Sequence, residues 1–197
     1  PRSSNQTLTG SFSRKSLDLD LAYFDWKFAS WGNLIGGKMR QPFVKGGQNL
    51  YWDNDITPEG LAFQFNRGIW FGTAYNFWLN EVGGNENTIT SDAQMAGLQI
   101  GAKVPVGAST LTLAAHYYDL SAVEGRAPAP VFGGNANGNT TIGTGATLAL
   151  LNDYEVIDVL VQFDTTLGTL PFQLWAEAAQ NRAPDGLVPG TLLANDL

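Results

Sequence analysis

The feature that most constrains this chain is a repeated alternation of apolar and polar residues along segments of roughly ten residues. Such alternation is typical of β-strands, because successive side chains point to opposite faces of a sheet. In the segment Ile69–Asn80, for example, Phe71, Tyr75 and Phe77 fall on one face and Asn76 falls on the other. Helical periodicity is nearly absent, so the sequence predicts an all-β, antiparallel fold.

We predict eight strands, most of them longer than the ~5–6 residues of an ordinary strand and close to the ~9–11 residues that a tilted membrane-crossing strand needs. Their ranges are Leu17–Phe28, Asn33–Arg40, Glu59–Asn66, Ile69–Asn80, Asp92–Val104, Thr110–Leu120, Asp153–Asp164 and Leu170–Asn181. Residues 1–197 are expected to form a single β-barrel segment. It has a loop over residues 1–16, eight strands in four hairpins over residues 17–181, and a loop over residues 182–197.

The connections between these strands alternate between short and long. The short ones carry turn residues, mostly glycine, and are Trp31-Gly32, Arg67-Gly68, Pro105–Ala108 and Thr165–Gly168. The long ones are Gln41–Pro58, Glu81–Ser91 and Ser121–Asn152, the last with an expected surface loop over residues 133–147 and a short helix over Ala146–Asn152. Transmembrane barrels show this asymmetry between short periplasmic turns and longer extracellular loops. The alternative, a soluble β-sandwich, has no reason to keep its long loops at one end.

Aromatic residues lie mainly towards the two ends of the predicted strands. Phe28, Trp31 and Trp70 lie near tight turns, and Trp78 and Tyr117 lie towards the long connections. Amphipathic rings gather in this way at the two interfaces of a bilayer. Charged residues make up only 15% of the chain, against roughly 25% in soluble domains. Together these features predict an antiparallel transmembrane β-barrel whose outside contacts membrane lipid.

The composition also excludes several classes of protein. A net charge of −7 provides no basic patch for phosphates, so we expect no nucleic-acid partner. The chain has no Cys and one histidine, His116, so we expect no metal and no cofactor. Asp158 and Glu177 are not tied by the sequence to a second carboxylate, and no nucleophile–base pair is present. We therefore expect no catalytic residues and no enzyme activity.

The alternation also predicts which way each strand residue faces. If the apolar face meets lipid, the residues expected to point outwards include Phe71, Phe77, Leu98, Leu111, Val159 and Leu174. The opposite face is polar and lines a water-filled lumen. The residues expected to line this pore are Asp25, Lys27, Lys38, Arg40, Gln64, Asn76, Gln99, Lys103, His116, Asp158, Gln162 and Glu177, with Thr112 and Gln173 beside them. Their mixed signs indicate no preference for anions or cations.

The long connection Gln41–Pro58 is rich in aromatic and acidic residues. One interpretation is that it folds into the barrel and narrows it, with a constriction formed by Trp52, Asp53, Asp55 and Glu59 opposite Lys38 and Arg40. The alternative is an exposed lid whose Trp52 packs on the rim. The run Asp53-Asn54-Asp55 lacks the spacing and glycine of a calcium-binding loop.

Two stretches of the first third of the chain resemble a known family. The first is Leu19–Trp26 followed by Gly36–Phe43, which contains Gly-Lys-Met-Arg-Gln-Pro-Phe, and the second is Leu50–Ala62, which contains Trp-Asp-Asn-Asp-Ile-Thr-Pro-Glu-Gly-Leu-Ala. Both are similar to the "putative porin" family of Gram-negative bacterial outer membranes. The resemblance implies an outer-membrane porin for diffusion of small hydrophilic solutes or ions, with a barrel of about sixteen strands. The alternative function is a non-conducting barrel that serves as a structural or partner-binding module, its bore filled by Trp70, Trp78 and Trp175.

Eight strands are too few for the lumen that the sequence predicts. An eight-stranded barrel is just wide enough to be filled by side chains, which leaves no room for many long polar groups. We therefore expect the remaining barrel strands of the same protein to complete the wall. The strand from Leu17 should then not pair with the strand that ends at Asn181. The sequence leaves open whether the barrel assembles as a homo-oligomer.

Overall fold

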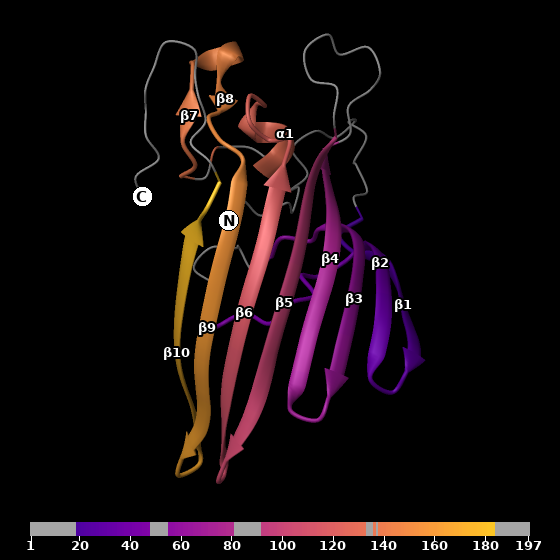
Figure 1. The fold of residues 1–197 in the computed structure, drawn as a ribbon, viewed down its shortest axis with the longest axis vertical. Coiled ribbons are helices and arrows are strands. Elements are labelled where there is room, and N and C mark those ends of the chain that lie inside the picture. The colour runs from indigo at the N-terminus through magenta and orange to yellow at the C-terminus, as the bar shows by residue number, and fades with distance from the viewer. Residues whose placement is uncertain (1–18, 48–54, 81–91, 133–135, 137, 184–197) are drawn as a thin grey trace, which may run out of the picture.

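The computed structural model describes residues 19–47, 55–80, 92–132, 136 and 138–183. Their main element is an eight-stranded antiparallel sheet in the order β1-β2-β3-β4-β5-β6-β9-β10, in which each strand pairs with the next (Figure 1). The bounds are β1 Ala22–Ala29, β2 Gly32–Lys38, β3 Glu59–Arg67, β4 Trp70–Asn80, β5 Ala93–Val106, β6 Ser109–Ser121, β9 Tyr154–Leu167 and β10 Leu170–Asn181. All eight predicted strands are thus present.

The strand ends differ from the prediction in ways that the turns explain. Gly68, Gly107 and Gly168 have φ angles of 64°, 62° and 66°, which glycine adopts without steric cost. These positive φ angles close very short turns, so the β5–β6 ladder continues to the pair Val106 and Ser109, inside the predicted turn Pro105–Ala108. At the start of the sheet, residues 19–21 are not part of β1, and Leu17 lies outside the described residues.

The connection between β6 and β9 contains short elements of its own. They are α1 (Pro128–Phe132), β7 (Thr141–Ile142), a 3₁₀ turn over Gly145–Thr147, and β8 (Ala149–Leu150), which pairs with β7. The predicted helix over Ala146–Asn152 is wrong, because Leu150 is buried in β8 as the partner of Thr141. No helix in the described part of the chain is long and apolar enough to cross a membrane.

The main sheet is open. Among the described strands, β1 and β10 form its two edges and do not pair with each other, as expected (Figure 1). A closed barrel and a total of about sixteen strands remain predictions. The four tight turns lie at one end of the sheet, here called the tight-turn end. Helix α1 and strands β7 and β8 lie at the other, the long-connection end.

The two faces of the sheet differ in their side chains and in what covers them. Directly opposed residues of an antiparallel ladder point to the same side, so the register assigns each strand residue to a face. One face, the outer face, presents exposed apolar side chains, among them Trp26, Leu98 and Val159. The other, the inner face, is crossed by residues 39–47, the crossing segment, which leaves β2 and runs behind the sheet in Figure 1.

The predicted facing is right for some strands and wrong for β4. Leu98, Val159 and Leu174 are exposed on the outer face, and Leu111 lies on the same side opposite Phe163. Phe71 and Phe77, in contrast, are 4% and 2% exposed on the inner face. They oppose Gly101 and Met95 of β5. Apolarity alone could not decide between the faces of β4, because Trp70 and Trp78 occupy the other one.

Candidate functional site on the inner face

The crossing segment is anchored to the middle of the sheet by Gln99 of β5. The Gln99 Nε2 donates to the carbonyl oxygen of Val44 at 2.8 Å, and the Val44 backbone nitrogen donates to Gln99 Oε1 at 2.7 Å. The Gln99 side-chain amide therefore pairs with both the N–H and the carbonyl group of Val44, as the backbone of a neighbouring strand would. Gln99 is only 2% exposed, so these bonds are shielded from competing water.

A second anchor lies on β3 and β4. The Pro42 carbonyl oxygen accepts from Thr73 Oγ1 at 3.2 Å and from Gln64 Nε2. The Asn33 side-chain amide then donates to Gln64 Oε1 at 3.3 Å and to Asp25 Oδ1 at 2.7 Å. Polar side chains of four adjacent strands are thereby linked to the start of the crossing segment.

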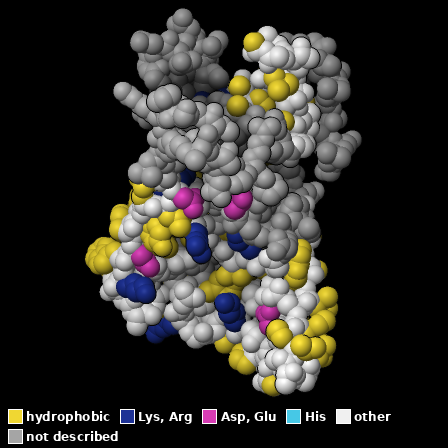
Figure 2. Space-filling view, turned by 180° about the vertical axis from the view of Figure 1, so that it is seen from behind, with side chains coloured by type: hydrophobic (Ala, Val, Ile, Leu, Met, Phe, Trp, Pro, Cys, Tyr) yellow, Lys and Arg dark blue, Asp and Glu magenta, His cyan; other side chains and the backbone are white. Residues whose placement is uncertain are grey.

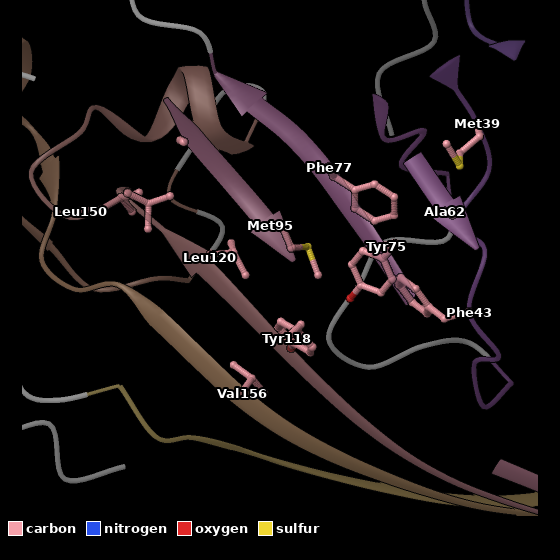
Figure 3. Close-up of a cluster of buried hydrophobic side chains, with 12 residues drawn as sticks. Met39, Phe43, Ala62, Tyr75, Phe77, Met95, Tyr118, Leu120, Leu150 and Val156 are labelled. Carbon is pink, nitrogen blue, oxygen red and sulfur yellow. The ribbon is translucent and has the colours of Figure 1, made fainter. Parts of the chain in front are cut away.

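Between these anchors, Phe43 packs into an aromatic group that includes the one histidine. The Phe43 ring centroid lies 5.4 Å from that of Tyr75 and 4.8 Å from that of His116. The Tyr75 hydroxyl and His116 Nε2 are 2.8 Å apart, and His116 Nδ1 lies 3.8 Å from Asp158 Oδ2. Figure 3 shows Phe43 and Tyr75 side by side, with Phe77 next along β4. Ring packing and buried polar contacts therefore hold the segment here.

The far end of the crossing segment fits closely against β9 and β10. A Cβ atom built on Gly46 would lie 2.5 Å from Leu160 Cδ1 and 3.1 Å from the Trp175 ring. Leu160 belongs to a small apolar cluster with Phe71 and Ala114, on which Trp175 and Val44 pack. The absence of a side chain at Gly46 is therefore what allows the segment to lie flat on the sheet.

This close approach predicts a local effect of substitution. Gly46→Ala should force the segment away from β9 and lower the free energy of unfolding by about 1–3 kcal/mol through overpacking. Denaturant titration of the protein folded in detergent micelles measures this change. Combining the substitution with Leu160→Ala, which removes Cδ1, should give a loss smaller than the sum of the two single losses. Strictly additive losses would contradict the contact.

Most of the residues predicted to line a pore lie on the inner face. The register places Asp25, Gln64, Gln99, Lys103, His116, Asp158, Gln162 and Glu177 there. Gln99, His116 and Asp158 are buried together under the crossing segment, whereas Lys103 is exposed nearer the tight-turn end. Figure 2, seen from behind relative to Figure 1, shows Lys and Arg side chains gathered on this side.

The other predicted residues lie elsewhere. Asn76 is on the outer face, where it opposes Leu61 and Ala96 and donates to Gln94 Oε1 at 3.1 Å, so its predicted facing is wrong. Lys27 is exposed beside an irregularity of the β1 ladder. Lys38 ends β2, and its Nζ donates to the Thr57 carbonyl oxygen at 3.2 Å. Arg40 follows β2 and is exposed.

The residues predicted to form a constriction are not the ones that cover the inner face. Trp52 and Asp53 lie outside the described residues, and Asp55 and Glu59 are exposed at the start of β3. Glu59 is the register partner of Lys38. It is the earlier part of the same connection, residues 39–47, that crosses the sheet.

Two of the three tryptophans proposed to fill the bore cannot do so from their positions. Trp70 and Trp78 are exposed on the outer face, because they oppose Ala102 and Gln94 on that side of β5. Trp175 does face inwards, against Gly46 and Gly47.

Several residues of this site were missed by sequence reasoning, chiefly Pro42, Phe43 and Tyr75. A signal for Tyr75 is present in β5, where Gly97 and Gly101 stand opposite Tyr75 and Phe71. A Cβ on either glycine would overlap the facing ring. Small residues opposite large ones therefore mark the packed face of the sheet.

Comparison with known proteins gives one match. Residues 1–154 match the model of a family described as "Putative porin". No curated protein and no solved structure matches the chain.

Proposed function

This chain belongs to the "Putative porin" family, and from that premise we propose that its sheet is part of the wall of an outer-membrane pore. Small hydrophilic solutes or ions diffuse through this pore, and the crossing segment narrows it. The observation that carries the proposal is the opposite character of the two faces. One face exposes rows of large apolar side chains, and the other holds an inserted segment among polar groups.

The outer face supports a position in lipid. Its exposed large apolar residues come from every strand of the sheet except β2. They include Trp26 and Phe24 of β1, Leu61 of β3, and Leu174 of β10, which is 62% exposed. Monomeric soluble proteins rarely expose contiguous apolar patches larger than a few hundred Å². In a bilayer the same side chains contact acyl chains at no cost. This face and the family together support the proposed position in the bacterial outer membrane.

The open edges support a wall completed by further strands. Unpaired backbone groups cost several kcal/mol each in hydrocarbon, so β1 and β10 need partners there. We propose that other strands of the same protein pair with both edges. Such a barrel is wider than eight strands and has room for the crossing segment beside an open passage.

Single-channel recording in a planar bilayer tests the proposal. The full-length protein should give discrete conductance steps that scale with salt concentration, because a wet lumen carries ions. A refolded protein that inserts into vesicles and gives no steps would contradict it.

A non-conducting barrel is the second candidate function, and a specific observation favours it. Much of the inner face near the long-connection end is covered by a buried apolar cluster that includes Met39, Met95, Leu120 and Val123. In that case the membrane-inserted protein gives no conductance at any voltage, and its long connections bind a partner.

A further inference from the structure

A cavity of about 440 Å³ opens at the long-connection end of the sheet, where residues of both faces line it. Its body is apolar, and the inner-face part of its wall includes Phe77 of β4, Met95 of β5, Leu120 of β6 and Phe43 of the crossing segment. Phe77, Met95 and Leu120 belong to the buried cluster drawn in Figure 3. The volume lies within the roughly 300–1,000 Å³ typical of sites for small molecules, which are lined mainly by apolar side chains with a few polar groups.

The charged groups of this cavity lie on one side of it. Lys38 and Glu59 are register partners at the ends of β2 and β3, on the outer-face side of these strands, and both line the cavity. The Lys38 ammonium is held at the wall by its bond of 3.2 Å to the Thr57 carbonyl oxygen. An ammonium group has three donors, so this bond leaves Lys38 able to donate to a bound anionic group. Glu59 can accept from a bound cationic group at the neighbouring position.

We propose that this cavity binds a small zwitterion with an apolar body, of the class of α-amino acids with apolar side chains. The carboxylate of the solute pairs with Lys38, its ammonium pairs with Glu59, and its side chain lies against Phe77, Met95 and Leu120. The proposal rests on the proposed function, because it makes the cavity a binding position for a solute at the mouth of the pore.

The two charged groups of the cavity favour a zwitterion over an anion or a neutral molecule of similar shape. A monoanion of the same shape gains the bond to Lys38 but brings a negative charge close to Glu59, which is repulsive. A neutral apolar molecule displaces water from both charged groups without replacing their partners, which costs free energy. Only a zwitterion complements one cation and one anion placed side by side.

The place of the cavity suits an entry site. It lies beside Phe43, so a solute released from it meets the crossing segment next. Passage through a pore requires binding weak enough for the solute to leave, so we expect fast, reversible binding.

Binding is tested with the full-length protein in detergent micelles and L-phenylalanine as the probe, by calorimetry and by the fluorescence of Trp78, which also lines the cavity. We expect saturable binding that weakens about tenfold or more in Lys38→Met and in Glu59→Gln, since charge-assisted hydrogen bonds contribute about this much. Arg182→Met removes an exposed cation beyond the end of β10 and should leave binding unchanged. Circular dichroism checks that each variant is folded.

Analogues of the probe separate the parts of the site. 3-Phenylpropionate lacks the ammonium, phenethylamine lacks the carboxylate and glycine lacks the apolar body, so each should bind more weakly than L-phenylalanine. Equal binding of 3-phenylpropionate, or no saturable binding of L-phenylalanine, overturns the proposal. Single-channel recording keeps the two claims apart. A protein that conducts but does not bind contradicts the cavity site alone, whereas one that binds but does not conduct contradicts the pore.

Discussion

Val159→Arg is expected to lower the free energy of unfolding in lipid vesicles by about 2–4 kcal/mol, because it places a charge on the lipid-facing side of a barrel near the bilayer midplane. Val159 lies near the middle of β9, between Ala115 of β6 and Ala178 of β10, and is 47% exposed on the outer face. Urea titration of the refolded protein, followed by tryptophan fluorescence, measures the change.

Val106→Arg is the matched control for this substitution. Val106 is 49% exposed and also faces outwards, but it is the last residue of β5 at the tight-turn end. A charge at that depth reaches the interface, so the expected loss is only ~0–1 kcal/mol. In a soluble protein the two substitutions would be equivalent, because both side chains would already face water. Equal effects would therefore contradict the membrane position of the outer face.

Gln99→Leu is expected to have the second large effect, on both stability and conductance. It removes both partners of the Val44 backbone unit while keeping a side chain of similar size. Leaving two buried backbone groups unpaired should cost about 2–4 kcal/mol. The crossing segment then leaves the sheet more often, so single-channel conductance should rise or fluctuate between a low and a high level.

Gln180→Leu provides the same chemical change at a position without this role. Gln180 is exposed on β10 and opposes Ile157 on the outer face. Its substitution should change the free energy of unfolding by no more than about 0.5 kcal/mol and leave the conductance unchanged. If Gln99→Leu behaves like Gln180→Leu, the segment is not held by Gln99 and does not narrow a pore.

The strands and tight turns of this fold follow from local sequence. Alternation with a period of two indicates the strands. The tight turns are indicated by Gly68, Gly107 and Gly168, since the chain needs a positive φ at these positions. These are short-range properties, so one sequence is enough to predict them. The parity of β9 and β10 was equally readable, because polar residues such as Asp158 and Gln162 interrupt one face, whereas the other carries a row of apolar residues that includes Val159 and Leu174.

The inner face could not be predicted in the same way. Val44 and its anchor Gln99 are 55 residues apart, and nothing in the sequence of the crossing segment indicates which strand it meets. Strand β4 has aromatic residues on both faces, so its orientation depends on the space that Gly97 and Gly101 leave on the neighbouring strand. The apolar clusters of the inner face depend on such long-range contacts, and a polar lumen was expected in their place.

The natural absence of cysteine allows the most direct test of the central claim, that the outer face contacts lipid and the inner face contacts the water of a pore. Single cysteines at Lys103 and Leu98 place a thiol on the inner and outer face of the same strand, at two exposed positions. During single-channel recording, a charged, water-soluble thiol reagent should reduce the conductance of Lys103→Cys stepwise and leave that of Leu98→Cys unchanged. Modification of Leu98→Cys at the same rate, or a conductance indifferent to modification at Lys103→Cys, would contradict the account.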